Sequence, residues 1–273
     1  MYQLEPDRYY PGLSMAGIGR FLQFEVLGAS PKVRACVWIS DTLAADGRNL
    51  LPPMAVVGME RSPYPIGPRG SARWCSGPIH PRRVSGRDFI ALDFGRPGRL
   101  FKTRRHGLMQ LFGKDIIIDS RRLTAFARDI SLVDEDEYRR FKAPTSISKF
   151  EDLRNYDLEY AGIYEDLWFS DSAFVVLKSR KTDKVFNFAG VVPNIGNPNF
   201  STRLTISIGK TKRTFPLKVG EFLVTVPVRS GETTQRVSFS FDSYQHLPFG
   251  DDRPVTLKLH YLGFSENPGE SVQ

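Results

Sequence analysis

The chain has 273 residues, of which 41% are hydrophobic and 25% charged, and it carries a formal net charge of +8. These values fit a globular protein of one large or two ordinary domains, and no apolar run reaches the roughly 18 residues that a membrane-spanning helix needs. The N-terminus lacks a basic end followed by an apolar core, so we expect no export signal and predict a cytoplasmic protein.

Short stretches of alternating apolar and polar residues predict β-strands throughout the first half of the chain. Strands are expected at residues 21–27, 33–39, 54–58, 89–94 and 123–132. Residues 61–87 are instead predicted to form a loop, because they contain five prolines, which cannot donate to a sheet ladder.

An acidic segment separates the two halves. Asp134 can cap a helix, and Glu137 stands three residues later as in a capping box, so a short helix is predicted to begin here. Strands follow at residues 173–177, 185–188, 204–208, 222–228, 237–241 and 255–262, with glycines in the turns between them. Pro227 is expected to place its strand at a sheet edge.

This spacing predicts an all-β protein with two tandem antiparallel β-sandwich (jelly-roll-like) domains joined by a short helical linker. The predicted limits are 1–140 for a basic N-terminal domain, 141–157 for the linker, 158–265 for the C-terminal domain and 266–273 for a polar tail.

A short pattern occurs once in each half. Residues 119–132 and 251–264 align so that an Asp-x-Arg turn precedes an alternating strand in both. The repeat suggests two copies of one β-domain. The pair Asp251 and Arg253 is interpreted mainly as a turn that accepts backbone N–H groups, and alternatively as a site for sugar hydroxyls.

Three tracts of the second half resemble a known family. They are Tyr160-x-Gly-x-Tyr-Glu-Asp-x-Trp168, Gly220-Glu-Phe-x-Val-x-Val-Pro227 and Gly250-Asp-Asp-Arg253-Pro-Val. They resemble bacterial β-sandwich domains that occur beside or fused to glycosyltransferases in polysaccharide and lipopolysaccharide gene clusters. Leu167 stands where that pattern usually has Gly, and Val255 where it has Leu. The resemblance implies a noncatalytic accessory role in glycan assembly or recognition, with a glycosyltransferase as a possible partner and no catalytic residue to carry over.

Positive charge is concentrated in the first half. Residues 1–140 hold 22 Lys and Arg against 15 Asp and Glu, whereas residues 141–273 hold 16 against 15. A guanidinium grips carboxylate or phosphate with two bonds, so an Arg-rich surface around Trp74 is predicted to bind an anionic ligand such as an acidic glycan. Its candidate residues are Arg69, Arg73, Trp74, Arg82 and Arg83. The alternative is a solvated basic face. Nucleic acid is disfavoured because no RNP aromatic pair, helix-turn-helix pattern or GXXG loop is found.

Two further aromatic residues and two cysteines complete the candidates. Tyr164 and Trp168 can stack on a sugar or plug one end of the sandwich. Cys36 and Cys75 have no metal-ligand spacing and are predicted to be buried free thiols, with a disulfide only if the protein is exported.

Signals for catalysis are poor. The four histidines show no HxH or HExxH spacing, so neither a metal nor a cofactor is expected. We therefore predict a noncatalytic glycan-binding or scaffolding protein of bacterial polysaccharide assembly. The alternatives are a sandwich-fold hydrolase or lyase that acts on glycans, and a purely structural protein-interaction module.

Overall fold

The computed structural model describes residues 2–3, 16–18, 21–27, 32–42, 54–57, 60–63, 72–93, 98–99, 122–123, 125–229, 231–248 and 254–269. This part of the chain is mostly antiparallel β-structure with a single α-helix, α1 (Glu135–Arg139), so the predicted all-β class is confirmed. The helix begins directly after Asp134, as the acidic segment indicated. No described helix is long and apolar enough to cross a membrane.

Two compact units divide the chain. The N-terminal unit comprises Met1–Gly67 and Cys75–Glu135, and the C-terminal unit comprises Pro68–Trp74 and Asp136–Gln273. The division at residue 135 lies close to the predicted end of the first domain, but the segment 68–74 belongs with the second unit. The predicted tandem arrangement and its linker limits stay predictions.

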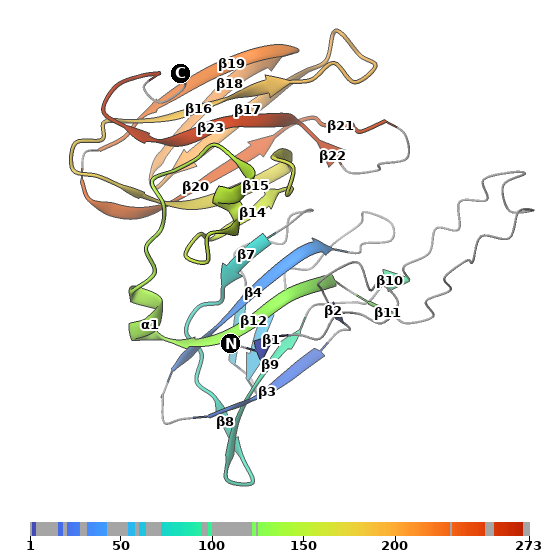
Figure 1. The fold of residues 1–273 in the computed structure, drawn as a ribbon, viewed down its shortest axis with the longest axis vertical. Coiled ribbons are helices and arrows are strands. Elements are labelled where there is room, and N and C mark those ends of the chain that lie inside the picture. Colours follow the sequence, from blue (N-terminus) through green and yellow to red (C-terminus); the bar gives the residue numbers. More distant parts are fainter. Residues whose placement is uncertain are drawn as a thin grey trace, which may run out of the picture. The chain divides into compact units, whose positions relative to one another are not determined.

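The C-terminal unit contains two antiparallel sheets (Figure 1). One has the order β19–β16–β23–β13 and the other the order β18–β17–β20–β15–β14, with β7 beside β14, and the start of β15 also pairs with β23 and so connects them. The strands are β7 (Ala72–Cys75, whose last residue belongs to the N-terminal unit), β13 (Ser146–Ile147), β14 (Tyr160–Ile163), β15 (Trp168–Ser179), β16 (Val185–Val192), β17 (Ser201–Ile208), β18 (Thr211–Lys218), β19 (Gly220–Pro227), β20 (Thr233–Phe241) and β23 (Leu257–Ser265). A short ribbon of β21 (Gln245–His246) and β22 (Pro254–Val255) lies between β20 and β23 in the chain, and a 3₁₀ helix spans Phe150–Arg154.

Alternation builds the core between these sheets. Along β17, for example, Leu204, Ile206 and Ile208 are buried while the residues between them are not. The centre of the core is a group of packed phenylalanines from both sheets: Phe169, Phe186, Phe188, Phe239 and Phe264. Edge-to-face ring pairs such as Phe169 with Phe239, whose centroids lie 5.4 Å apart, add to the burial of apolar area.

Two proline-containing strands mark edges of these sheets. Pro227 ends β19, which pairs only with β16 among the described strands, so the predicted edge position is confirmed. β18 was not predicted, because the sequence Thr-Lys-Arg-Thr-Phe-Pro-Leu-Lys shows no clean alternation. It too lies at an edge, where Pro216 need not donate a ladder hydrogen bond and lysines are tolerated.

The N-terminal unit also contains two main sheets. One is built on β12 (Ala125–Asp134), which pairs with β1 (Tyr2–Gln3), β2 (Ala16–Ile18) and β4 (Val33–Thr42). The other has the order β3–β9–β5–β6, with β8 on β9: β3 (Phe21–Val26), β5 (Met54–Val57), β6 (Glu60–Pro63), β8 (Arg82–Val84) and β9 (Arg87–Asp93). A two-stranded sheet joins β10 (Gly98–Arg99) to β11 (Arg122–Leu123).

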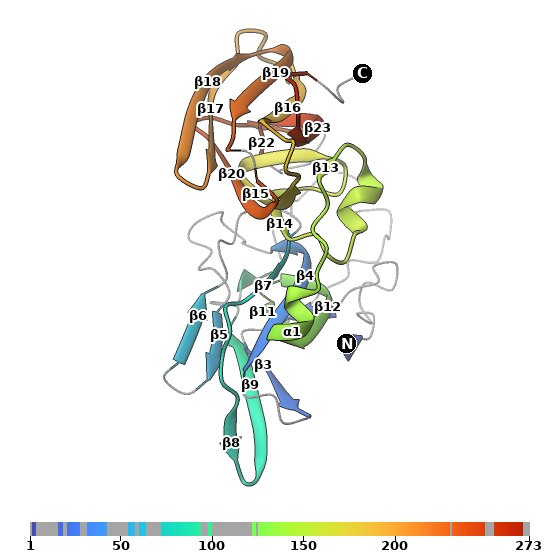
Figure 2. The ribbon, with the colours of Figure 1, turned by 90° about the vertical axis from the view of Figure 1, so that its left-hand side faces the viewer.

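The prediction of a loop at residues 61–87 is wrong. β7 and β8 lie in this range, and β8 forms a hairpin with β9 that turns through Ser85 and Gly86 (Figure 2). Both turn residues have positive φ, 51° and 81°, as a two-residue hairpin loop of type I′ requires. The prediction failed because, in the described part, Pro78 and Pro81 stand between strands and Pro63 is the last residue of the edge strand β6, so none of them interrupts a strand.

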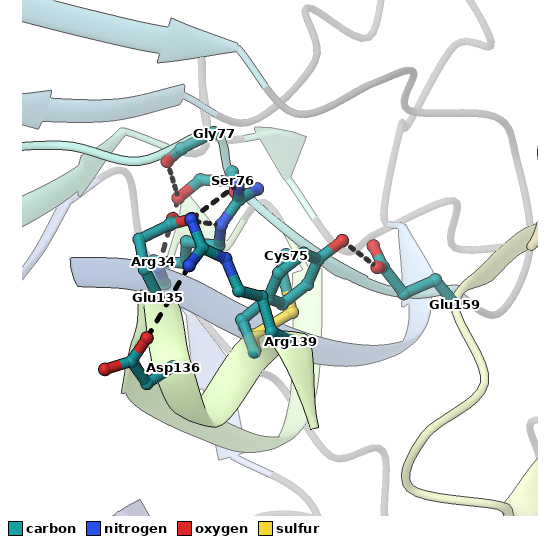
Figure 3. A network of polar contacts seen from close by, with 11 residues as sticks. Arg34, Cys75, Ser76, Gly77, Glu135, Asp136, Arg139 and Glu159 are labelled. Atoms are coloured by element: carbon teal, nitrogen blue, oxygen red, sulfur yellow. Dashed lines mark hydrogen bonds and ion pairs between the residues drawn. A yellow bond between two sulfur atoms is a disulfide. The ribbon is translucent and has the colours of Figure 1, made fainter. Parts of the chain in front are cut away.

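The prediction of free thiols is also wrong. Cys36 and Cys75 form a disulfide within the N-terminal unit, and Figure 3 shows it beside a set of polar contacts. Arg34 lies in that set: its Nε donates to Glu135 Oε1 at 2.6 Å and its Nη1 to the Ser76 carbonyl at 3.1 Å. The 39-residue separation of the cysteines gave no sign of this pairing, since it depends on which strands become neighbours.

Candidate functional site

Several strand ends of the C-terminal unit meet at one end of the sandwich. In the register of the sheets Trp168 at the start of β15 pairs with Lys258 on β23, Lys258 pairs with Val191 on β16, and Val191 pairs with Glu221 on β19. Leu257 and Leu259 on either side of Lys258 are buried, so Lys258 points away from the core. A row of side chains therefore crosses the outer surface of this sheet.

A β-bulge adds His260 to that row. Ala189 pairs with Tyr261 and the next residue, Gly190, pairs with Leu259, so His260 is left over between them. A Cβ on Gly190 would lie 2.4 Å from the Lys258 carbonyl oxygen, so the close approach here needs glycine. Such bulges re-aim single side chains, and here His260 Nδ1 lies 3.3 Å from Glu221 Oε2.

We call Trp168, Lys258, His260 and Glu221 the Trp168 row. The indole is half-buried and the Lys258 ammonium lies 5.8 Å from its ring centroid. The side chains of His260 and Glu221 are 48% and 72% exposed. The row thus combines a flat apolar ring, a cation, an imidazole and a carboxylate on one accessible surface.

A tight turn fixes the position of the indole. The Tyr164 N–H donates to the Trp168 carbonyl at 2.8 Å, and the Leu167 N–H to the Tyr164 carbonyl at 2.9 Å. Leu167 has φ +67°, a left-handed conformation that favours glycine. Tyr164 itself is buried and donates its hydroxyl to the Pro254 carbonyl at 3.2 Å, so it supports the turn rather than facing solvent.

A second polar cluster lies at the same end, where β17 begins and β20 ends. Asp242 accepts hydrogen bonds from the Arg203 N–H at 2.8 Å, from Arg203 Nε at 2.7 Å and from the Thr202 hydroxyl at 3.1 Å. These donors hold the pKa of Asp242 far below its ordinary value, with the Arg203 backbone N–H the largest cause. Beyond it Tyr244, which is 41% exposed, packs edge-on against His246.

The residues predicted for an Arg-rich ligand surface lie in different surroundings. Trp74 is 1% exposed, so its ring offers no face to a sugar in this structure. Arg73 is also buried: its Nη1 donates to the Asn155 carbonyl at 3.0 Å and its guanidinium lies 4.9 Å from the Tyr156 ring centroid. Both are in the C-terminal unit.

Arg82 and Arg83 are exposed residues of β8 in the N-terminal unit. The structure therefore places Tyr164 and Trp168 together in one turn, Arg82 and Arg83 together on one strand, and Arg73 with Trp74 on another. Arg69, Asp251 and Arg253 lie outside the described residues.

Sequence reasoning missed most of the Trp168 row. Lys258 and His260 alternate with Leu257 and Leu259, which is a signal that they face outward. Their meeting with Trp168 and Glu221 depends on strand pairing between distant segments. Among the described residues no group of three or more His, Cys, Asp or Glu side chains could hold a metal ion.

No family model and no curated protein matches the chain. Similar solved structures include the secreted serine protease VesC from Vibrio cholerae, at 7% identity and TM-score 0.31, where the match covers 92% of this chain and 48% of that one. The tandem CBM51 modules of the family 98 glycoside hydrolase Sp3GH98 from Streptococcus pneumoniae match at 9% identity and TM-score 0.26, covering 93% and 83%. A Paenibacillus xanthan lyase matches at 10% identity and TM-score 0.24, covering 90% and 23%. The chain spans about half the length of the protease. TM-scores this far below 0.5 establish neither a family nor a function.

Proposed function

We propose that this protein is a noncatalytic glycan-binding protein and that sugar binds at the Trp168 row. The observation that carries the proposal is an accessible indole held on the first residue of a strand by a tight turn, with Lys258, His260 and Glu221 on the same surface. The apolar face of a sugar ring packs on an aromatic ring, and its hydroxyls need donors and acceptors nearby. A site held by strands is also preorganised, which limits the entropy lost on binding.

The chemistry of the row favours binding over catalysis. Glycoside hydrolysis uses two carboxyl groups that face each other across the scissile bond. Within the row Glu221 is the carboxylate, and it lies on an open surface beside His260 with 72% of its side chain exposed. An exposed carboxylate in contact with an imidazole is suited to accept hydrogen bonds from sugar hydroxyls.

The proposal includes a role in bacterial polysaccharide assembly beside a glycosyltransferase, which is supported by the resemblance of the tracts that end at Trp168, Pro227 and Val255. We propose an oxidising compartment as the location of the protein, in place of the predicted cytoplasm. The disulfide between Cys36 and Cys75 supports folding in an oxidising compartment, where such bonds form and persist.

Binding of oligosaccharides measured by calorimetry tests the site. We expect Trp168→Ala to lower affinity by up to roughly tenfold, since stacking on an aromatic ring contributes about 0.5–1.5 kcal/mol, and Trp168→Tyr to retain most of it. Tyr156→Ala is the matched control, because it removes an aromatic side chain that is 52% exposed and outside the row. Equal affinities of the folded Trp168→Ala variant and the wild type would refute the site.

A further inference from the structure

A hairpin of the C-terminal unit carries many cations and no carboxylate. Residues 201–220, which form β17, β18 and their connections, contain five basic residues and neither Asp nor Glu. All five are exposed, and we call them the basic ribbon: Arg203, Lys210, Lys212, Arg213 and Lys218. Counting charge over whole halves of the chain conceals this cluster, because residues 141–273 are nearly neutral in sum.

Strand register shows which cations share a face. Leu217 is buried against the core, so its neighbour Lys218 faces outward, and Lys212 follows the same alternation. Arg203 pairs with Pro216 and therefore lies on that outer face too. Lys212 and Lys218 stand six residues apart on β18, about 20 Å along an extended strand. A ligand that contacts both must be a chain rather than a single small ion.

Hydroxyl groups fill the space between the cations. On the same face Thr205 pairs with Thr214, their Oγ1 atoms lying 3.1 Å apart, and Ser207 pairs with Lys212. Hydroxyls can donate to and accept from the hydroxyls of a sugar. The large hydrophobic side chains that are exposed in the described chain all lie outside residues 201–220, so the ribbon has no exposed aromatic ring for stacking a nucleobase.

Carboxylates close to the ribbon are already engaged. Asp242 is paired with Arg203, with Nε to Oδ2 at 2.7 Å, and Glu221 is in contact with His260. The four lysines and arginines from 210 to 218 have no acidic residue within their own hairpin. Their positive potential is therefore offered to solvent along one edge of the sheet.

We propose that the basic ribbon binds a glycan chain that carries carboxylate groups. The inference rests on the proposed function, since it names the chemistry of the glycan, but it uses residues outside the Trp168 row. Carboxylates of the chain contact the lysine ammonium groups, and its hydroxyls contact Thr205, Ser207 and Thr214. Lys218 stands three positions before Glu221 of the Trp168 row in the sequence, at the step from β18 to β19.

Calorimetry with hexagalacturonate and with its methyl ester tests this proposal, because the ester keeps the sugar and removes the charge. The triple variant Lys210→Ser, Lys212→Ser, Lys218→Ser should lose roughly tenfold to 100-fold in affinity for the acid, as each exposed charge pair contributes up to about a factor of five. Its affinity for the ester should be unchanged. Affinity for the acid should also fall as salt rises from about 0.05 to about 0.3 M.

The matched control removes the same number of cations elsewhere: Arg82→Ser, Arg83→Ser, Arg87→Ser in the β8–β9 hairpin. It should leave both affinities within about twofold, because these arginines belong to the other unit and are not part of the ribbon. Equal losses in the two triple variants would overturn the ribbon and indicate a response to net charge. Tighter binding of duplex DNA of equal charge would also overturn it, in favour of nucleic acid.

The two proposals fail in different ways. If Trp168→Ala abolishes binding of both oligosaccharides while the ribbon variant keeps the preference for the acid, the ribbon is refuted and the Trp168 row stands. If neither oligosaccharide binds the wild type, both proposals are refuted for this class of sugar. Circular dichroism of each variant checks that the exposed substitutions leave the fold intact.

Discussion

Two basic hairpins, β8–β9 and β17–β18, share a two-residue turn but differ in their acidic neighbours. On β8–β9, Arg83 pairs across the strands with Asp88, and Arg87 Nη1 lies 3.3 Å from Glu25 Oε2. On β17–β18 no carboxylate occurs within the hairpin. The hairpin in the more basic half of the chain therefore presents less uncompensated charge, which shows that charge must be counted around a surface and not along the sequence.

The turns differ as well. Ser85 and Gly86 both have positive φ, whereas in β17–β18 the pair of turn residues is Gly209, at φ +56°, and Lys210. Only one of these four positions, Ser85, forces a residue with a side chain into the left-handed region. The β8–β9 turn therefore holds two residues in the left-handed region, one of them a serine, whereas the β17–β18 turn holds only a glycine there.

The largest effect should come from the disulfide, which belongs to the unit of the β8–β9 hairpin. Cys36→Ser with Cys75→Ser should destabilise that unit by roughly 4 kcal/mol, from the entropy of closing a loop of this length. Hydrogen exchange should then show faster opening of β4 and β9 and unchanged protection in β17 and β20. Equally accelerated hydrogen exchange in both units would show that the disulfide stabilises the β17–β18 hairpin as much as the β8–β9 hairpin.

Next comes the turn of the basic ribbon. Gly209→Ala should cost roughly 1–2 kcal/mol, because alanine is disfavoured at φ +56° although nothing lies within 4 Å of the added Cβ. Chemical denaturation measures the loss. Ser85→Asn in the other hairpin is the comparison, and it should be neutral or slightly stabilising because Asn tolerates the left-handed region. A neutral Gly209→Ala would contradict the assignment of the turn.

Removing the acids should make the two hairpins alike. Glu25→Gln with Asp88→Asn leaves Arg82, Arg83 and Arg87 uncompensated, and we expect affinity for hexagalacturonate to rise about fivefold at low salt. The extra binding should disappear when the three arginines are also replaced by serine. No gain at any salt concentration would show that absence of carboxylates is not what distinguishes the ribbon.

The smallest effect concerns pH at the base of β17. The pKa of Asp242 is lowered in the folded protein, so its contribution to stability is complete above the unfolded value of roughly 4 and is lost as pH falls below that toward the folded pKa. Asp242→Asn should flatten the pH dependence of the melting temperature in this acidic range. An unchanged dependence would assign the acid sensitivity to other carboxylates.

The sequence predicted the strand content better than the site. Alternating residues such as Leu204, Ile206 and Ile208 reveal a strand with one buried face wherever it lies. The edge strand β18 was not predicted, because most of its residues are exposed and its sequence therefore lacks that alternation. Trp168 was named from sequence, but Lys258, His260 and Glu221 join it only through pairing of β15, β23, β16 and β19.

The candidate residues of the predicted Arg-rich surface differ in burial, although they lie close together in the sequence. Arg73, Trp74, Arg82 and Arg83 lie within eleven positions of one another, yet two are buried and two are exposed. No pattern in the sequence distinguishes them, because Arg73 is held by a carbonyl from Asn155, more than 80 residues away. A basic stretch is therefore weak evidence for a ligand surface until the strands that cover it are known.

The bulge at His260 separates this residue from the packing of the core. Before it the odd-numbered residues of β23, such as Leu259, point into the core, and after it the even-numbered ones, Leu262 and Phe264, do so. Deleting position 260 would thus restore regular parity without turning any leucine outward. A change at residue 260 should therefore alter the Trp168 row without exposing an apolar side chain of β23.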